Sequence, residues 1–65
     1  MWIKSTRGEL INADQLCSIS YVDESYHDRG TYGNTDNEVY FISDNDCTTT
    51  IINAIMRGTT YLEVR

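Results

Sequence analysis

Apolar and polar residues alternate over several short stretches of the chain, which is typical of β-strands that expose one face. Residues 2–6 and 9–12 are predicted to form two strands joined by a turn at Arg7-Gly8, where glycine can adopt positive φ. A second turn is expected at 12–15, because Asn and Asp side chains bond to their own backbone. The chain therefore begins with the pattern of a β-meander.

Two further strands are predicted in the middle of the chain. Residues 16–26 alternate as a half-buried strand of an antiparallel sheet does. Residues 38–43 are apolar on both faces, which indicates a central strand or one with a covered second face. The alternating residues of the first of these strands are Cys17, Ile19 and Tyr21 on one face and Ser18 and Ser20 on the other.

A helix is predicted to follow, with its start at 43–46 and its end just before Gly58. Ser43 is a suitable N-cap, Asp46 stands three residues later as in a capping box, and Gly58 suits the C′ position. The run of β-branched residues at 48–52 favours a strand locally, but the two end signals and the helical spacing favour a helix. The apolar residues at helical spacing are Cys47, Ile51, Ala54 and Ile55.

A last strand at 59–64 completes the order β-β-β-β-α-β. We expect a single α+β domain, residues 1–65, in which an antiparallel β-sheet has a single helix packed on one face. One helix leaves the second face of the sheet uncovered, which indicates a homodimer or another protein partner. The predicted core residues are Ile3, Leu10, Ile19, Tyr21, Val39, Phe41, Ile51, Ile55, Leu62 and Val64.

Charge is unevenly distributed along the chain. Nine of the ten acidic residues lie between Glu9 and Asp46, and Arg29 is the one base within that span. Such a surface repels phosphate, so we expect no direct binding of nucleic acid. Such acids most commonly serve only to keep a small protein soluble. They can also steer the molecule toward a protein partner with a basic surface, including one that normally holds nucleic acid.

The sequence also bears on location. No apolar run approaches the roughly 20 residues that cross a bilayer, and no basic segment followed by an apolar one precedes the first strand. We therefore expect no membrane partner and a cytoplasmic protein. Cys17 and Cys47 are too few for a secreted disulfide framework and are expected to be free thiols.

Residues 24–38 are predicted to form a long loop, and long loops in compact domains often carry function. Tyrosines in this segment would either anchor a partner at low entropic cost or pack locally along a hairpin. The candidate site combines these tyrosines with acidic residues of the loop and of the segment after the next strand. The candidate partner-binding residues are Tyr26, Asp28, Tyr32, Asp36, Glu38, Asp44 and Asp46.

Catalytic and cofactor signatures are absent from the sequence. It has no phosphate-binding glycine loop, dinucleotide fingerprint or nucleophile elbow, so we expect no enzyme and no cofactor. Cys17, His27 and Cys47, with Asp28 nearby, could supply zinc ligands. Because they lack the usual paired spacing, a zinc-stabilised structural protein is the alternative and not the primary expectation.

The segment NEVYFISDND at 37–46, followed by a short helix ending in Arg57-Gly58, resembles small acidic phage anti-CRISPR proteins, in particular an inhibitor of a Cas9-type nuclease. The resemblance covers about a third of the chain, residues 37–58. It implies a phage or prophage inhibitor that binds a nuclease through acidic and aromatic side chains. Glu38, Asp44 and Asp46 are the positions that match it.

Sequence and resemblance together predict a small acidic protein-binding module. It would occupy a basic, nucleic-acid-binding surface of a partner such as a CRISPR nuclease. A homodimeric accessory subunit without enzymatic activity is a further alternative.

Overall fold

The structure, a computed structural model, describes residues 1–23 and 29–65 of the chain. In this part of the chain there are six strands, a short 3-10 turn and one α-helix. In chain order the elements are β1 (Trp2–Lys4), β2 (Leu10–Asn12), η1 (Ala13–Gln15), β3 (Ser18–Val22), β4 (Gly30–Asn34), β5 (Val39–Ser43), α1 (Thr48–Met56) and β6 (Tyr61–Glu63).

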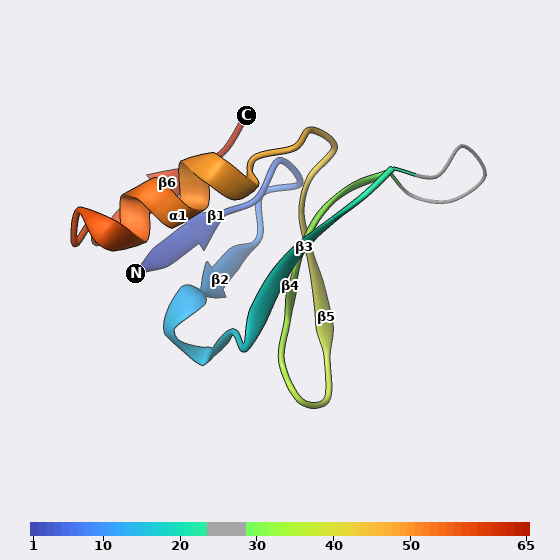
Figure 1. The fold of residues 1–65 in the computed structure, drawn as a ribbon, viewed down its shortest axis with the longest axis horizontal. Helices are drawn as coiled ribbons and strands as arrows, with labels where there is room; N and C mark the ends of the chain where they lie inside the picture. Colours follow the sequence, from blue (N-terminus) through green and yellow to red (C-terminus); the bar gives the residue numbers. More distant parts are fainter. Residues whose placement is uncertain (24–28) are drawn as a thin grey trace.

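The strands form two three-stranded sheets. The N-terminal sheet has the order β2-β1-β6, in which β1 pairs antiparallel with β2 and parallel with β6. The central sheet has the order β3-β4-β5 and is antiparallel throughout. The N-terminal sheet and α1 lie at one end of the long axis, and the β3–β4 hairpin extends toward the other end (Figure 1).

The α+β class and the packing of a single helix on a sheet are confirmed. The arrangement is more divided than predicted, because the strands form two sheets instead of one. A backbone link joins the sheets where Thr6 N–H donates to the Ile42 carbonyl, at 2.9 Å.

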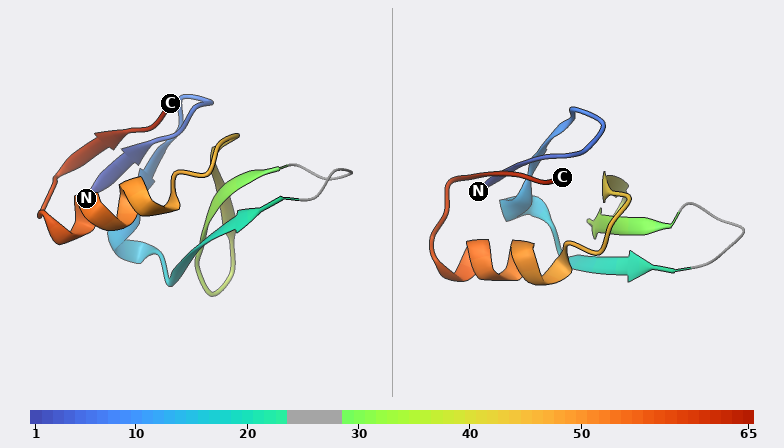
Figure 2. Two further views of the ribbon diagram at one scale, coloured as in Figure 1. Left: turned by 45° about the horizontal axis from the view of Figure 1, so that its top comes forward. Right: turned by 90° about the horizontal axis from the view of Figure 1, so that it is seen from above.

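The core lies between the helix and the two sheets. Ile3 and Ile11 are paired neighbours on β1 and β2, and both side chains point to the helix side of the N-terminal sheet. Figure 2 shows α1 running beside that sheet. The buried cluster comprises Ile3, Ile11, Ile42, Cys47, Ile51 and Val64.

The helix ends as predicted but begins later. Gly58 has φ +72°, and its N–H donates to the Ile55 carbonyl at 3.1 Å, which is the geometry of a C′ glycine. The first helical residue is Thr48, so the prediction of Ser43 as N-cap is wrong. Ser43 is fully buried, and its Oγ accepts from Asn45 N–H at 3.1 Å.

The predicted loop at 24–38 contains β4, the middle strand of the central sheet, so the loop prediction is wrong for 30–34. Two glycines hid this strand, because glycine weakens strand propensity. A Cβ on Gly33 would lie 2.7 Å from Leu16 Cδ1, and a Cβ on Gly30 would overlap the Ser43 carbonyl oxygen. The close packing around β4 therefore requires glycine at these two positions, and the same glycines made the strand hard to predict from the sequence.

Two of the predicted core residues are on the surface. Leu10 and Val39 are 63% and 66% exposed, and Ile11, next to Leu10, is buried instead. In β5, Phe41 is buried as predicted, and Ile42 is buried as well at a bulge: Tyr32 pairs with Phe41 and Thr31 pairs with Ser43, so Ile42 is an extra residue.

Other core predictions divide as follows. Ile55 is 51% exposed, so it does not belong to the core as predicted. Cys17, which the sequence placed on the same strand face as Ile19, is exposed. The confirmed buried residues are Ile3, Phe41, Ile51 and Val64, and those that are partly buried are Ile19, Tyr21 and Leu62.

Candidate protein-binding surfaces

Acidic residues lie at both ends of β5. At one end, Asp36 and Glu38 belong to the turn between β4 and β5. This turn is fixed by Thr35, whose Oγ1 accepts from the backbone N–H of Asn37 and Glu38 at 3.3 and 3.0 Å. Both carboxylates are exposed on a turn of defined shape.

These two carboxylates perturb neighbouring groups. The Cys17 thiol donates to Asp36 Oδ1 at 3.5 Å, and this hydrogen bond, with the charge of the carboxylate, raises the pKa of Cys17. The Tyr40 hydroxyl donates to Glu38 Oε2 at 2.7 Å, which raises the pKa of Tyr40. Both effects hold the proton on the donor, so Cys17 is not an activated nucleophile.

At the other end of β5, Asp44 and Asp46 lie in the connection to α1. Asp46 Oδ1 accepts from Thr48 N–H at 3.2 Å, where the positive end of the helix dipole favours an anion. Buried Thr31 of β4 holds this connection in place, because its Oγ1 donates to the Asn45 carbonyl and accepts from Cys47 N–H.

Polar side chains occupy the sheet face between the two acidic ends. Asn34 Nδ2 donates to Ser18 Oγ and Ser20 Oγ, each at 3.2 Å. Tyr32 shares this face because it pairs with Ser20 and Phe41. It is partly buried in an edge-to-face contact with Phe41, with ring centroids 5.5 Å apart. Tyr32 therefore helps to build the sheet, and only its exposed part is offered to a partner.

The predicted site is thus partly assembled. Tyr26 and Asp28 lie outside the described residues. The other candidates all belong to the central sheet or its connections, but they do not form one cluster. Asp36 and Glu38 are separated from Asp44 and Asp46 by the length of β5, roughly 15 Å for a five-residue strand.

The charge asymmetry of the sequence maps onto the two sheets. Residues 16–46, which hold the central sheet and its connections, contain seven acids and one base, leaving three acids and four bases in the rest of the chain. In the acidic part, Arg29 forms an ion pair with Asp23, in which Arg29 Nε lies 2.9 Å from Asp23 Oδ1. The central sheet therefore carries a negative field, and the N-terminal sheet with α1 is nearly neutral.

The candidate metal ligands are differently placed. Cys17 is exposed beside Asp36, whereas Cys47 is buried in the core, where burial raises the pKa of its thiol. His27 lies outside the described residues. Among the residues that the structure describes, no three His, Cys, Asp or Glu side chains come together as a metal site.

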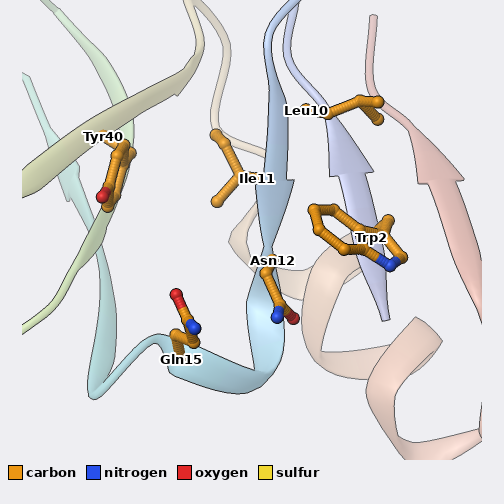
Figure 3. A pocket seen from close by; sticks show the side chains of 6 residues that line it. All are labelled: Trp2, Leu10, Ile11, Asn12, Gln15 and Tyr40. Atoms are coloured by element: carbon orange, nitrogen blue, oxygen red, sulfur yellow. The ribbon is translucent and has the colours of Figure 1, made fainter.

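A second exposed surface is formed by apolar residues that the sequence analysis did not group together. Trp2 and Leu10 border a hollow of about 230 Å³ whose opposite side is Tyr40 of β5 (Figure 3). Trp2 also lines a neighbouring hollow of about 480 Å³ with Ile55. The sequence signal that could have identified Trp2 is its place before Ile3 on a strand of alternating burial.

No protein-family model, curated protein or solved structure matches the chain. Within residues 1–23 and 29–65, the chain has no helix of the length and apolarity needed to cross a membrane.

Proposed function

We propose that the chain is a non-enzymatic protein-binding module that places its acidic central sheet against a basic surface of a partner protein. The observation that carries this proposal is the concentration of seven acids and one base in residues 16–46. Five of these acids and the base are among the described residues, where they belong to the central sheet or its connections. Like charges gathered in this way steer a positively charged surface toward the molecule.

The geometry suits an extended basic surface. The two exposed acidic ends of the central sheet lie roughly 15 Å apart, which exceeds the Debye length of about 8 Å at physiological salt. Each end therefore interacts with a different group of Lys or Arg residues. Ser18, Ser20 and Asn34 between the ends offer polar contacts that need no charge.

The energetics favour many weak contacts over one strong one. An exposed ion pair contributes about 1 kcal/mol or less, so four carboxylates supply a few kcal/mol at most. The exposed part of Tyr32 and the 66% exposed Val39 add apolar contact on the same sheet. Binding should therefore be rapid, sensitive to salt, and dependent on the whole sheet.

A basic surface that ordinarily holds nucleic acid is the partner type that this arrangement fits best. Occupying such a surface would exclude the nucleic acid and inhibit the partner. The resemblance of residues 37–58 to anti-CRISPR proteins makes a CRISPR nuclease the first partner to test.

The experiment measures binding of a labelled DNA target to a guide-loaded CRISPR nuclease by fluorescence anisotropy while the chain is titrated. We expect the chain to displace DNA, and Asp44→Lys to require about tenfold more protein, because an ion pair becomes a repulsion of similar size. Glu9→Lys is the matched control, since it alters net charge equally on an exposed side chain outside the acidic part.

Displacement that is unaffected by Asp44→Lys, or affected equally by Glu9→Lys, would place the contact elsewhere. No displacement at any concentration would remove the nuclease as a partner. Displacement that is as strong at 500 mM as at 50 mM salt would contradict a charge-driven mechanism.

A further inference from the structure

The N-terminal sheet has one face that α1 does not cover. In a strand, alternate side chains point to opposite faces, and residues paired in register lie side by side. Ile3 and its neighbours Ile11 and Leu62 point to the helix side. Their flanking residues form the other side, which we call the open face: Trp2, Lys4, Leu10, Asn12, Tyr61 and Glu63.

The open face is unusually apolar for a surface. Trp2, Leu10 and Tyr61 are 49%, 63% and 48% exposed. Trp2 lies beside Tyr61 in the β1–β6 register and shares the hollow of Figure 3 with Leu10. The three side chains are therefore contiguous, and a contiguous exposed apolar patch marks an interaction surface.

The charges of the open face complement each other. Lys4 is the register partner of Glu63, so one base and one acid stand side by side. The Tyr61 hydroxyl donates to Glu63 Oε1 at 3.3 Å and keeps this carboxylate over the face. Under a two-fold axis, Lys4 of one copy can meet Glu63 of the other, which makes the face self-complementary.

The rest of the molecule determines how two copies can approach. Residues 16–46 carry seven acids and one base, so two central sheets repel each other. The N-terminal sheet and α1 lie toward the opposite end of the long axis (Figure 1) and belong to the nearly neutral part of the chain. Like-charge repulsion between copies is therefore smallest where the apolar patch lies.

We propose that the open face is the interface of a homodimer, in which two copies pack face to face through Trp2, Leu10 and Tyr61. Taking about 100 Å² for each of the two half-exposed aromatics and somewhat less for each of the four other residues, the face offers on the order of 500 Å² per copy. Two copies would bury about 1,000 Å², which is at the small end of specific interfaces. We therefore expect a dimer that dissociates on dilution in the micromolar range.

This inference does not rest on the proposed function, because it concerns the isolated protein. Its test is sedimentation velocity of the purified chain from about 1 µM to 1 mM. The weight-average mass should rise from 7.5 kDa toward twice that value. Leu10→Ser should raise the dissociation constant at least tenfold, because it removes an apolar contact from both sides of a two-fold interface.

Two further variants make the test specific. Met56→Ser removes an apolar side chain that is 80% exposed on α1, outside the open face, and should leave dimerisation unchanged. Lys4→Glu should weaken the dimer, and Lys4→Glu combined with Glu63→Lys should restore it, because the complementary pair is re-formed in the opposite sense. Circular dichroism of each variant verifies that the fold is retained.

A chain that stays monomeric to 1 mM would overturn the proposal and leave the open face to a different protein. A dimer that Leu10→Ser leaves intact, or that Met56→Ser disrupts, would overturn it equally by moving the interface to another surface. Failure of the charge swap to restore association would reject the two-fold pairing of Lys4 with Glu63.

Discussion

Thr31 offers the sharpest test of how the central sheet is tied to the helix. Its side chain is fully buried; Oγ1 donates to the Asn45 carbonyl at 2.7 Å and accepts from Cys47 N–H at 3.0 Å. Cys47 is the N-cap of α1, and among the described residues its side chain makes no capping bond. One hydroxyl on β4 therefore secures the segment that carries Asp44 and Asp46.

Thr31→Val removes this hydroxyl while keeping the size and β-branching of the side chain. It leaves the buried Cys47 N–H and the partly buried Asn45 carbonyl without this partner; an unpaired buried group costs about 1–3 kcal/mol, and a partly buried one costs less. We expect a total loss of about 2–4 kcal/mol. The whole domain is stable by about 3–10 kcal/mol, at 0.05–0.15 kcal/mol per residue. The midpoint of thermal unfolding should fall by roughly 10–25 °C.

The assay is urea and thermal unfolding followed by circular dichroism, with two controls. Thr31→Ser keeps the hydroxyl and should lose about 1 kcal/mol for the missing methyl group. Thr48→Val removes a buried hydroxyl that has no hydrogen-bond partner within the described part of the chain, and should change stability by less than about 0.5 kcal/mol. If Thr31→Val is as stable as Thr31→Ser, or if Thr48→Val loses as much, the assigned role of Thr31 is wrong.

Two other predictions concern the strand faces and the thiols. Ile11→Ala should cost about 2–4 kcal/mol of stability in urea unfolding, whereas Leu10→Ala should cost less than about 1 kcal/mol, because only Ile11 is buried; equal losses would contradict the structure. The pKa values of Cys17 and Tyr40 are raised in the folded chain, so folding favours the protonated forms of both groups. This stabilisation is complete below the ordinary pKa values of 9.0 and 10.0. It is lost as the pH rises through the pKa values of the folded chain. Unfolding midpoints should therefore decline above about pH 9. Asp36→Asn should accelerate alkylation of Cys17 at pH 8, because it weakens the hydrogen bond and removes the charge that together raise the thiol pKa; an unchanged rate would exclude Asp36 as the cause.

The sequence was sufficient for features with a local physical signal. Gly58 marks the end of the helix because only glycine readily adopts its positive φ. Cys47 and Ile51 are spaced by one helical turn and face the core. The acidic character of residues 16–46 is a property of composition and needed no fold to be visible.

The strand faces could not be read in the same way. Leu10 and Ile11 are adjacent and both apolar, so alternation alone does not decide which of them points inward. In β5 the residues 39–42 are all apolar, and the bulge that buries Ile42 depends on pairing with Thr31 and Tyr32. Pairing between distant segments, and not local pattern, determined these positions.

The candidate surfaces show the same division. Asp36, Glu38, Asp44 and Asp46 are exposed as an acidic binding surface requires, yet the fold separates them into two ends of one strand. The sequence predicted that one sheet face stays uncovered, but it did not predict which residues form that face. Their exposure depends on which side of the N-terminal sheet α1 covers, and that choice is made by tertiary packing.

We propose that the acidic central sheet is the surface that meets the partner, and hydrogen–deuterium exchange of the chain, alone and bound to a guide-loaded CRISPR nuclease, would locate the contact. We expect slower amide exchange at 35–38 and 44–47 in the complex, with little change at 2–4 and 10–12. Protection confined to 2–4 and 10–12, with the two acidic ends unchanged, would contradict it.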